Sequence, residues 1–213
     1  MNRPTAARHR ALRVGITGPI GCGKSTIAGW LGKRPGIVVV DADQVAREVL
    51  DPGEPALAAV VARFGGGFVQ ADGSLDRAAL GRVVFADPAA LADLEAIVHP
   101  AVRPRILAAI AEADRRAASA VVIEAIKLVE GGLATLCDEV WFVSCQRATQ
   151  RDRLVGRGSP DDEADQRIAA QGDLVAAIAP FATRTIDTTG SAADARRMAE
   201  AALDEALARP QRS

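Results

Sequence analysis

Short apolar runs alternate with longer amphipathic stretches along the chain. Residues 37–40 form an uninterrupted β-branched run, which predicts a strand covered on both faces in a parallel sheet. Residues 12–17 form the first apolar run of the chain. Beyond it, Ile27, Ala28 and Leu31 stand at helical spacing and predict a helix over residues 25–32. The alternation predicts an α/β fold, namely a doubly wound, mainly parallel five-stranded sheet. The predicted strands cover residues 12–17, 37–40, 120–123, 140–143 and, more weakly, 183–186.

One gap between the predicted strands is much longer than a crossover helix requires. Roughly eighty residues separate the second apolar run from the third, where about a dozen would be enough for a crossover. This segment contains several helical stretches, so we expect a helical insertion at about residues 51–117. Its predicted breaks are Asp51-Pro52-Gly53, Gly65-Gly66-Gly67, Asp87-Pro88 and His99-Pro100.

A second excursion lies between the fourth and fifth predicted strands. Gly156, Gly158 and Pro160 interrupt an Arg-rich helix there. The sequence Ser159-Pro160-Asp161-Asp162 predicts the cap and first turn of the next helix. We expect a hinged helical lid over about 147–181, a core made of residues 13–50, 118–146 and 182–208 of one domain (13–213), and a basic N-terminal extension at 1–12.

Composition narrows the function classes. Of the 213 residues, 49% are hydrophobic and 25% are charged, and the formal net charge is −1. A nucleic-acid-binding surface needs a concentrated basic face, which this balance does not support. No apolar stretch approaches the length of a membrane span, and the start lacks the apolar segment of a secretory signal. We therefore expect a cytoplasmic protein without nucleic-acid or membrane partners, and the sequence leaves its oligomeric state open.

The cysteines and the N-terminal arginines carry smaller expectations. Cys22, Cys137 and Cys145 are odd in number and lack CxxC or Cys/His spacing, which argues against a disulfide framework or structural zinc. Cys22 is either an oxidisable thiol near a helix N-terminus or a small loop residue, and the second reading is favoured. The first thirteen residues hold four arginines and no acid. A transit peptide and a fraying basic extension both fit, and the extension is favoured.

The most specific motif lies between the first predicted strand and the helix that follows. Its glycines let backbone N–H groups turn inward around phosphate oxygens, and the helix N-terminus adds a favourable dipole. Lys24 is expected to bridge the β- and γ-phosphates of ATP, and the Ser25 hydroxyl to bind Mg²⁺. Residues 18–25 fit the pattern G-x-x-x-x-G-K-[ST], and the predicted ATP-binding segment includes one more residue. It consists of Gly18, Pro19, Ile20, Gly21, Cys22, Gly23, Lys24, Ser25 and Thr26.

The lysines help to decide which kind of nucleotide-binding protein this is. A guanine-specific switch usually carries [NT]-K-x-D, which surrounds none of the three lysines, Lys24, Lys33 and Lys127. An ATP-driven motor needs a partner-coupling element, for which 213 residues leave little room. A small-molecule kinase needs only a phosphate loop, Mg²⁺, a group at the acceptor hydroxyl and a cationic lid. The sequence offers a candidate for each.

Asp43 is the acceptor-side candidate. It follows the second predicted strand, whose carboxyl end faces the ligand crevice of a doubly wound sheet. If the strand stays extended, Asp41 and Asp43 point to one side. An aspartate at a strand-to-helix junction is also a common N-cap, and on these residues alone the cap is the favoured role of Asp43.

The sequence resembles the dephospho-CoA kinase family from about residue 13 to 205. Asp-Ala-Asp-x-x-Ala-Arg with His-Pro at this distance is more specific than the phosphate loop. The resemblance implies an ATP- and Mg²⁺-dependent kinase that phosphorylates the ribose 3′-hydroxyl of dephospho-CoA and yields coenzyme A and ADP. Beyond the phosphate loop, the matching segments include Asp41-Ala42-Asp43 with Ala46-Arg47, Arg63-Phe64-Gly65, Asp72-Gly73-Ser74-Leu75-Asp76-Arg77, Val98-His99-Pro100, Arg153-Leu154 with Arg157, and Arg167-Ile168-Ala169-Ala170-Gln171.

The same resemblance implies roles for residues on the acceptor side and in the lid. Asp43 becomes the base or orienter of the 3′-hydroxyl. Arg153 and Arg157 match the family's lid arginines, expected to share a helix face and to neutralise charge on the moving phosphoryl group; a merely solvated charged face is the alternative. The residues expected to hold the acceptor are Arg47, His99 and Arg103, although a helix-start histidine is an equal alternative for His99.

The chain departs from the family pattern in two places. Residues 124–130 replace a Pro-Leu-Leu-x-Glu stretch; here Glu124 is expected to reach Mg²⁺ through water, and Lys127 to contact phosphate or to pair with Glu130 or Glu124. The second departure is Asp187-Thr188-Thr189-Gly190, which replaces Asp-Asn-x-Gly in a loop expected to contact adenine through its backbone. Two other functions stay open: a kinase of this build with another hydroxyl or nucleotide acceptor, and a non-catalytic ATP-binding regulator.

Overall fold

The computed structural model describes residues 9–172 and 174–209. Two compact units divide the chain: residues up to Val40 together with those from Ile110 onward form the first, and Asp41–Ala109 form the second. The predicted division into core, insertion and lid stays a prediction. Of the predicted basic extension, residues 1–8 lie outside the described residues. Arg10 forms a two-pronged ion pair with Asp138 at 2.7 and 2.9 Å.

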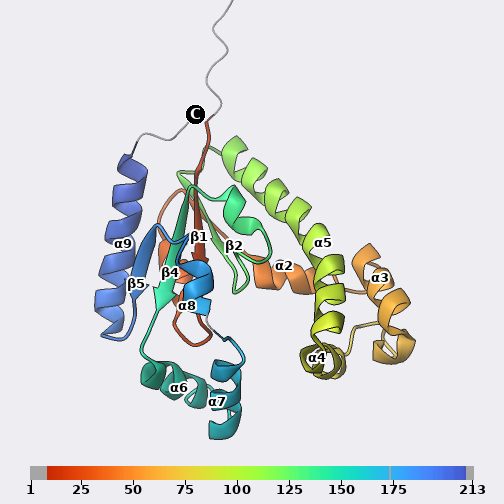
Figure 1. Ribbon diagram of the computed structural model, residues 1–213. Helices are drawn as coiled ribbons and strands as arrows, with labels where there is room; N and C mark the ends of the chain where they lie inside the picture. Colours follow the sequence, from red (N-terminus) through yellow and green to blue (C-terminus); the bar gives the residue numbers. More distant parts are fainter. Residues whose placement is uncertain (1–8, 173, 210–213) are drawn as a thin grey trace, which may run out of the picture. The chain divides into compact units, whose positions relative to one another are not determined.

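The first unit is built on a five-stranded sheet in the order β2-β3-β1-β4-β5 (Figure 1). Strand β1 pairs in parallel with β3 and β4, and β4 pairs in parallel with β5. The predicted doubly wound, mainly parallel fold is therefore confirmed. The strands are β1 (Leu12–Thr17), β2 (Ile37–Asp41), β3 (Ala120–Glu124), β4 (Glu139–Ser144) and β5 (Arg184–Asp187).

The prediction that residues 37–40 are covered on both faces is wrong. Strand β2 lies at one edge of the sheet, and the side chain of Val39 is 37% exposed. The fully covered strand is β3, in which all five residues are buried. An apolar β-branched run indicates a strand, but it does not determine the strand's place in the sheet.

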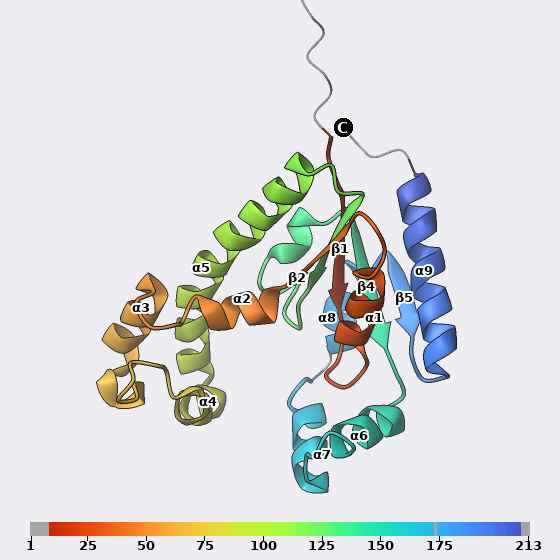
Figure 2. The ribbon, with the colours of Figure 1, turned by 180° about the vertical axis from the view of Figure 1, so that it is seen from behind.

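Helices cover both faces of this sheet (Figure 2). Apolar side chains of α1 and α9 pack with β1, β4 and β5 in one core cluster, which includes Leu31, Trp141 and Leu203. The helices of this unit are α1 (Lys24–Leu31), α6 (Arg147–Val155), α7 (Asp161–Ala169), α8 (Leu174–Ile178) and α9 (Ala192–Ala208), with a 3₁₀ turn, η2 (Leu133–Leu136). No helix among residues 9–172 and 174–209 is long and apolar enough to cross a membrane.

Helices α6 and α7 form a small hairpin beside the phosphate loop. Leu154, Ala164 and Ile168 are buried between them, and Ile20 of the loop packs against this cluster. The expected Ser159 cap is wrong: α7 begins at Asp161, its N-cap is Pro160, and no side chain caps it. Three acidic residues in the first turn of α7 instead face the positive end of the helix dipole.

The second unit is helical. It contains α2 (Ala42–Glu48), α3 (Pro55–Phe64), the 3₁₀ turn η1 (Gly66–Phe68), α4 (Arg77–Ala86) and most of α5 (Pro88–Arg115). The ion pairs Arg63–Asp93 and Arg105–Glu54 hold α3 and its N-cap residue to α5.

The predicted break at His99-Pro100 is wrong. Helix α5 is continuous from Pro88 to Arg115, with Pro100 and Pro104 inside it. A proline removes one backbone donor and strains the preceding turn, but tertiary contacts can hold the helix together around it. His99 is consequently an interior helix residue, and the alternative of a helix-start histidine is wrong as well.

Candidate active site

The phosphate loop joins β1 to α1 through backbone conformations that require glycine. Gly18 has a φ of 145°, and a Cβ built on it would lie 2.1 Å from the carbonyl oxygen of Val143 in β4. Gly23 is left-handed, with φ 91°, immediately before α1 begins at Lys24. The glycines of the motif thus bring the loop close to β4 and turn it into the helix N-terminus, where backbone N–H groups lack helical partners.

Lys24 lies under the loop. Its ammonium group donates to the carbonyl oxygens of Gly18, at 2.8 Å, and Pro19, at 3.1 Å, and only 6% of the residue is exposed. These neutral acceptors hold the charge beside the loop. Nucleotide phosphates, which carry full negative charge, are stronger acceptors for the same group.

Ser25 and Glu124 meet beside Lys24. The Ser25 hydroxyl donates to Oε1 of Glu124 at 2.5 Å, and Glu124, the last residue of β3, is 6% exposed. A hydroxyl and a carboxylate are hard oxygen ligands, which suit Mg²⁺. Among the residues the structure describes, no group of three or more His, Cys, Asp or Glu side chains could hold a metal ion. The hydroxyl of Ser25 and the carboxylate of Glu124 fit a Mg²⁺ ion whose other ligands would be phosphate and water.

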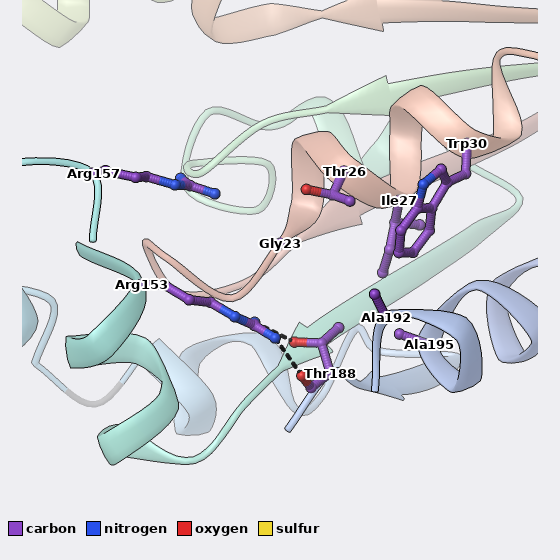
Figure 3. A pocket seen from close by; sticks show the side chains of 9 residues that line it. All are labelled: Gly23, Thr26, Ile27, Trp30, Arg153, Arg157, Thr188, Ala192 and Ala195. Atoms are coloured by element: carbon purple, nitrogen blue, oxygen red, sulfur yellow. Dashed lines mark hydrogen bonds between the residues drawn. The ribbon is translucent and has the colours of Figure 1, made fainter. Parts of the chain in front are cut away.

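A pocket of about 180 Å³ opens next to the loop (Figure 3). Trp30 lies at one end of it, and Arg153 approaches from helix α6 of the α6–α7 hairpin. Sequence reasoning did not single out Trp30, since a tryptophan on an amphipathic helix gives no sign of lining a ligand pocket. The lining residues are Gly23, Thr26, Ile27, Trp30, Arg153, Arg157, Thr188, Ala192 and Ala195.

Arg153 and Arg157 both line this pocket, but they do not share a helix face. Helix α6 ends at Val155, so Arg157 lies in the turn beyond the C-cap residue Gly156. The expected i, i+4 pair on one helix is therefore wrong, because the glycine break precedes the second arginine. Arg153 donates to the hydroxyl of Thr188 at 2.9 Å and to its carbonyl oxygen at 2.6 Å.

The loop after β5 places Thr188 at this point. The backbone N–H of Thr189 donates to Asp187 at 2.7 Å and closes a tight turn. Hydrogen bonds from the Thr189 hydroxyl and backbone N–H lower the pKa of the Asp187 carboxyl. Thr188 is 4% exposed, whereas the sequence predicted that this loop acts largely through its backbone. The departure from the family pattern at 187–190 was the one signal that pointed here.

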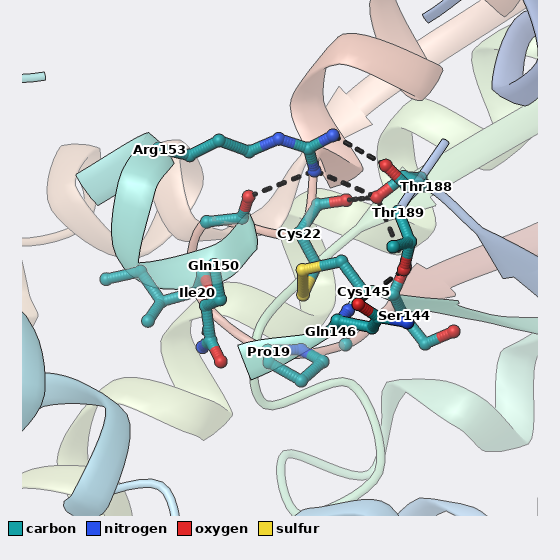
Figure 4. Close-up of a disulfide and its surroundings, with 12 residues drawn as sticks. Pro19, Ile20, Cys22, Ser144, Cys145, Gln146, Gln150, Arg153, Thr188 and Thr189 are labelled. Carbon is teal, nitrogen blue, oxygen red and sulfur yellow. Dashed lines mark hydrogen bonds between the residues drawn. A yellow bond between two sulfur atoms is a disulfide. The ribbon is translucent and has the colours of Figure 1, made fainter. Parts of the chain in front are cut away.

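A disulfide joins the phosphate loop to the end of β4, contrary to expectation. Cys22 and Cys145 are bonded, with Cα atoms 5.3 Å apart and a sequence separation of 123 (Figure 4). An odd number of cysteines does not exclude one bond, and the two partners are brought together only by the parallel pairing of β1 with β4. Cys137 stays a free thiol, and burial raises its pKa to about 12.

The helix cap expected at Asp43 is formed by Asp41 instead. Strand β2 ends at Asp41, whose carboxylate accepts from the backbone N–H of Gln44 at 2.9 Å and caps α2. Asp43 lies inside the first turn of α2, so the prediction that Asp43 is the N-cap is wrong. The strand alternation also ends before Asp43, because the helix begins at Ala42.

The other acceptor-side candidates also belong to the second unit. Arg47 lies four residues after Asp43 on α2, so the two side chains project from the same helix face, and Arg47 donates to Gln44 at 3.1 Å. His99 and Arg103 have the same spacing on α5. Each helix thus presents a pair of polar or charged groups on one face.

A family model described as dephospho-CoA kinase matches residues 12–194. The chain belongs to the dephospho-CoA kinase family. The resemblance inferred from the sequence is confirmed, and the match spans the phosphate loop, Arg153, Arg157 and the loop at Thr188. Because that model covers most of the described chain, membership does not depend on the phosphate loop alone.

Individual relatives agree. A dephospho-CoA kinase of Symbiobacterium thermophilum is 45% identical over 190 residues, covering 89% of this chain and 79% of the relative. One from Geobacter metallireducens is 43% identical over 197 residues, covering 92% and 97%. Among solved structures, a Thermus thermophilus protein superposes with a TM-score of 0.75 at 34% identity, covering 92% of this chain and 98% of its own. Campylobacter jejuni dephospho-CoA kinase gives 0.65 at 25% identity, covering 91% and 96%.

Proposed function

We propose that this protein transfers the γ-phosphoryl group of ATP to the ribose 3′-hydroxyl of dephospho-CoA, giving coenzyme A and ADP. Family membership confirms the predicted class of enzyme, a kinase of coenzyme A biosynthesis. The observation that carries the site assignment is the contact of Ser25, which follows Lys24 in the phosphate loop, with the buried carboxylate of Glu124.

The phosphate loop positions ATP in this proposal. Backbone N–H groups at the start of α1 donate to phosphate oxygens, and Lys24 exchanges the carbonyl oxygens of Gly18 and Pro19 for the β- and γ-phosphates. Little covalent chemistry is required of the protein in phosphoryl transfer, so catalysis rests on positioning and on charge stabilisation. The pocket between α1 and the loop after β5 is the proposed place for the adenosine part of ATP.

Ser25 and Glu124 are the proposed ligands of Mg²⁺, Glu124 directly or through water. When bound, the ion neutralises charge on the β- and γ-phosphates and orients them. Glu124 and Lys24 are each 6% exposed, and Glu124 contacts Ser25, the residue after Lys24, so both charges would act on the bound phosphates.

Asp43 is the proposed group that orients the acceptor hydroxyl and accepts its proton. With Asp41 now accounting for the cap, Asp43 has no capping role to explain its presence in the first turn.

Arg47, His99 and Arg103 are proposed to hold dephospho-CoA through its phosphates and polar groups. Arg157, in the glycine-flanked turn after α6, is proposed to approach the moving phosphoryl group. A cytoplasmic location, with no nucleic-acid or membrane partner, is part of the same proposal.

Measuring ADP release with ATP and Mg²⁺ tests this function. Dephospho-CoA is compared with shikimate, nucleosides and nucleoside monophosphates at equal concentration. The proposal expects dephospho-CoA to stimulate ADP release well above every other acceptor. Equal stimulation by other acceptors would indicate a kinase of different specificity, and ATP binding without acceptor-dependent ADP release would indicate a regulator.

A further inference from the structure

Thr188 connects three parts of the nucleotide site through one buried side chain. It follows β5 and is 4% exposed. Its hydroxyl donates to the carbonyl oxygen of Cys22 at 2.7 Å, with the carbonyl oxygen of Ser144 as a second acceptor at 3.1 Å. The same hydroxyl accepts from Arg153, as Figures 3 and 4 show. A phosphate-loop carbonyl, the end of β4 and the lid helix α6 therefore meet at this threonine.

Thr188 holds the guanidinium of Arg153 at two points. One nitrogen donates to the hydroxyl at 2.9 Å, and another donates to the carbonyl oxygen of the same residue at 2.6 Å. A planar guanidinium held at two points has a fixed direction. The carbonyl oxygen is present whatever residue stands at 188, but the hydroxyl is not. Without the Thr188 hydroxyl, Arg153 would keep only one of its two hydrogen bonds to residue 188.

The acceptors of Arg153 leave its charge available. Besides the two oxygens of Thr188, its further acceptor is the carbonyl oxygen of Gly21 at 3.5 Å. Within the described ranges, no carboxylate forms an ion pair with Arg153. Arg151 of the same helix, by contrast, pairs with Asp161 and Asp165. Neutral oxygens fix the direction of a cation without cancelling its charge, which suits a group that must attract an anionic ligand.

We infer that Thr188 is a positioning residue, which holds Arg153 ready at the pocket for the nucleotide. The inference rests on the proposed ATP site. It adds Thr188 to that site, where Thr188 holds Arg153 and Arg153 binds ATP. Arg153, already held in the free protein, contributes mainly to ATP affinity. Holding it beforehand avoids the entropy cost of ordering a long side chain when the nucleotide arrives.

The test is a double-mutant cycle on ATP binding, measured by calorimetry without any acceptor. Thr188→Val removes the hydroxyl and preserves the shape, and it should weaken ATP binding about tenfold, the effect of losing one hydrogen bond to a charged group. Thr188→Ser keeps the hydroxyl and should bind ATP within about twofold of the parent protein. Thr185→Val changes an exposed threonine of β5, the strand that precedes Thr188; it is the matched control and should change nothing.

The decisive comparison uses the Arg153→Ala background. If Thr188 acts through Arg153, Thr188→Val added to Arg153→Ala weakens ATP binding no further. A full additional loss in that background would overturn the inference, because Thr188 would then act on the phosphate loop through the Cys22 carbonyl alone. Normal ATP binding by Thr188→Val would overturn it too. Should Thr188→Val unfold, Thr188→Ala enters the same cycle, with thermal melts reporting folding.

This design separates the inference from the proposed function. Calorimetry needs no phosphoryl transfer, so a protein that fails to phosphorylate dephospho-CoA still gives a complete cycle. In the active enzyme, the positioning role predicts a higher KM for ATP in Thr188→Val with kcat little changed. A structural role alone would lower the melting temperature and leave the KM of the folded fraction unaltered.

Discussion

The hydroxyl of Ser25 lies 2.5 Å from the buried carboxylate of Glu124, across a sequence separation of 99 residues. The contact joins the first turn of α1 to the end of β3. Parallel pairing of β1 with β3 brings Ile16 opposite Glu124, so the sheet itself fixes this proximity. Glu124, proposed from the sequence as a Mg²⁺ contact through water, thus has the other proposed Mg²⁺ ligand, Ser25, as its hydrogen-bond partner.

Glu124→Gln should weaken the response to Mg²⁺. An amide keeps the size and accepts the Ser25 hydrogen bond, but it loses the charge that attracts the ion. We expect the Mg²⁺ concentration for half-maximal activity to rise about 10-fold or more, with folding preserved. A Mg²⁺ titration of activity measures this. Glu130→Gln, an exposed carboxylate six residues later, is the control and should titrate like the parent.

Lys24→Ala should abolish most turnover. The ammonium group of Lys24 is proposed to stabilise the negative charge of the phosphoryl group during its transfer. Without it, kcat should fall by two or more orders of magnitude, about 3 kcal/mol or above. Steady-state kinetics and a thermal melt check this. Lys33→Ala, which removes an exposed lysine just after α1, should retain kcat. If Lys24→Ala turns over at a near-normal rate, the phosphate-loop assignment fails.

The variant Asp43→Asn distinguishes a catalytic role of Asp43 from a structural one. Since Asp41 caps α2, Asp43→Asn should melt like the parent and bind ATP normally. It should lose most phosphorylation of dephospho-CoA, because a neutral amide cannot take the proton. Asp41→Ala is the contrasting variant: loss of the cap should cost roughly 1 kcal/mol of stability. An active Asp43→Asn enzyme would move the search for the acceptor-side carboxylate to Asp41 or Glu124.

The disulfide between Cys22 and Cys145 should stabilise the fold under oxidising conditions only. It closes a loop with a sequence separation of 123, so reduction should lower the free energy of unfolding by about 2–4 kcal/mol. Denaturant unfolding with and without a reductant measures the difference. Cys145→Ser should remove the sensitivity to reductant, whereas Cys137→Ser should keep it. Alkylation of the unfolded, unreduced protein at all three cysteines would show that the bond does not form.

The sequence was sufficient for the fold and the phosphate loop because both depend on local patterns. Apolar runs locate strands, and G-x-x-x-x-G-K-[ST] locates the loop between β1 and α1. It failed where the answer depends on which distant segments meet. The bond of Cys22 with Cys145 and the contact of Arg153 with Thr188 both arise from the pairing of β4 with its neighbours.

Local exceptions explain the other errors. Pro100 normally ends a helix, but α5 continues through it. The helix after β2 begins two residues earlier than a cap at Asp43 would require, which gives the cap to Asp41 and places Asp43 inside the helix. A difference of two residues at a helix start lies within the normal uncertainty of sequence patterns, yet here it decides which aspartate caps the helix.

The position of the new phosphate tests the central claim most directly. Dephospho-CoA is incubated with ATP, Mg²⁺ and the protein, and the product is examined by phosphorus–proton correlation NMR. The account predicts a new phosphate monoester coupled to the ribose 3′ proton, formed in equal amount with ADP. ADP formed without this product, or a phosphate on another hydroxyl, would contradict it.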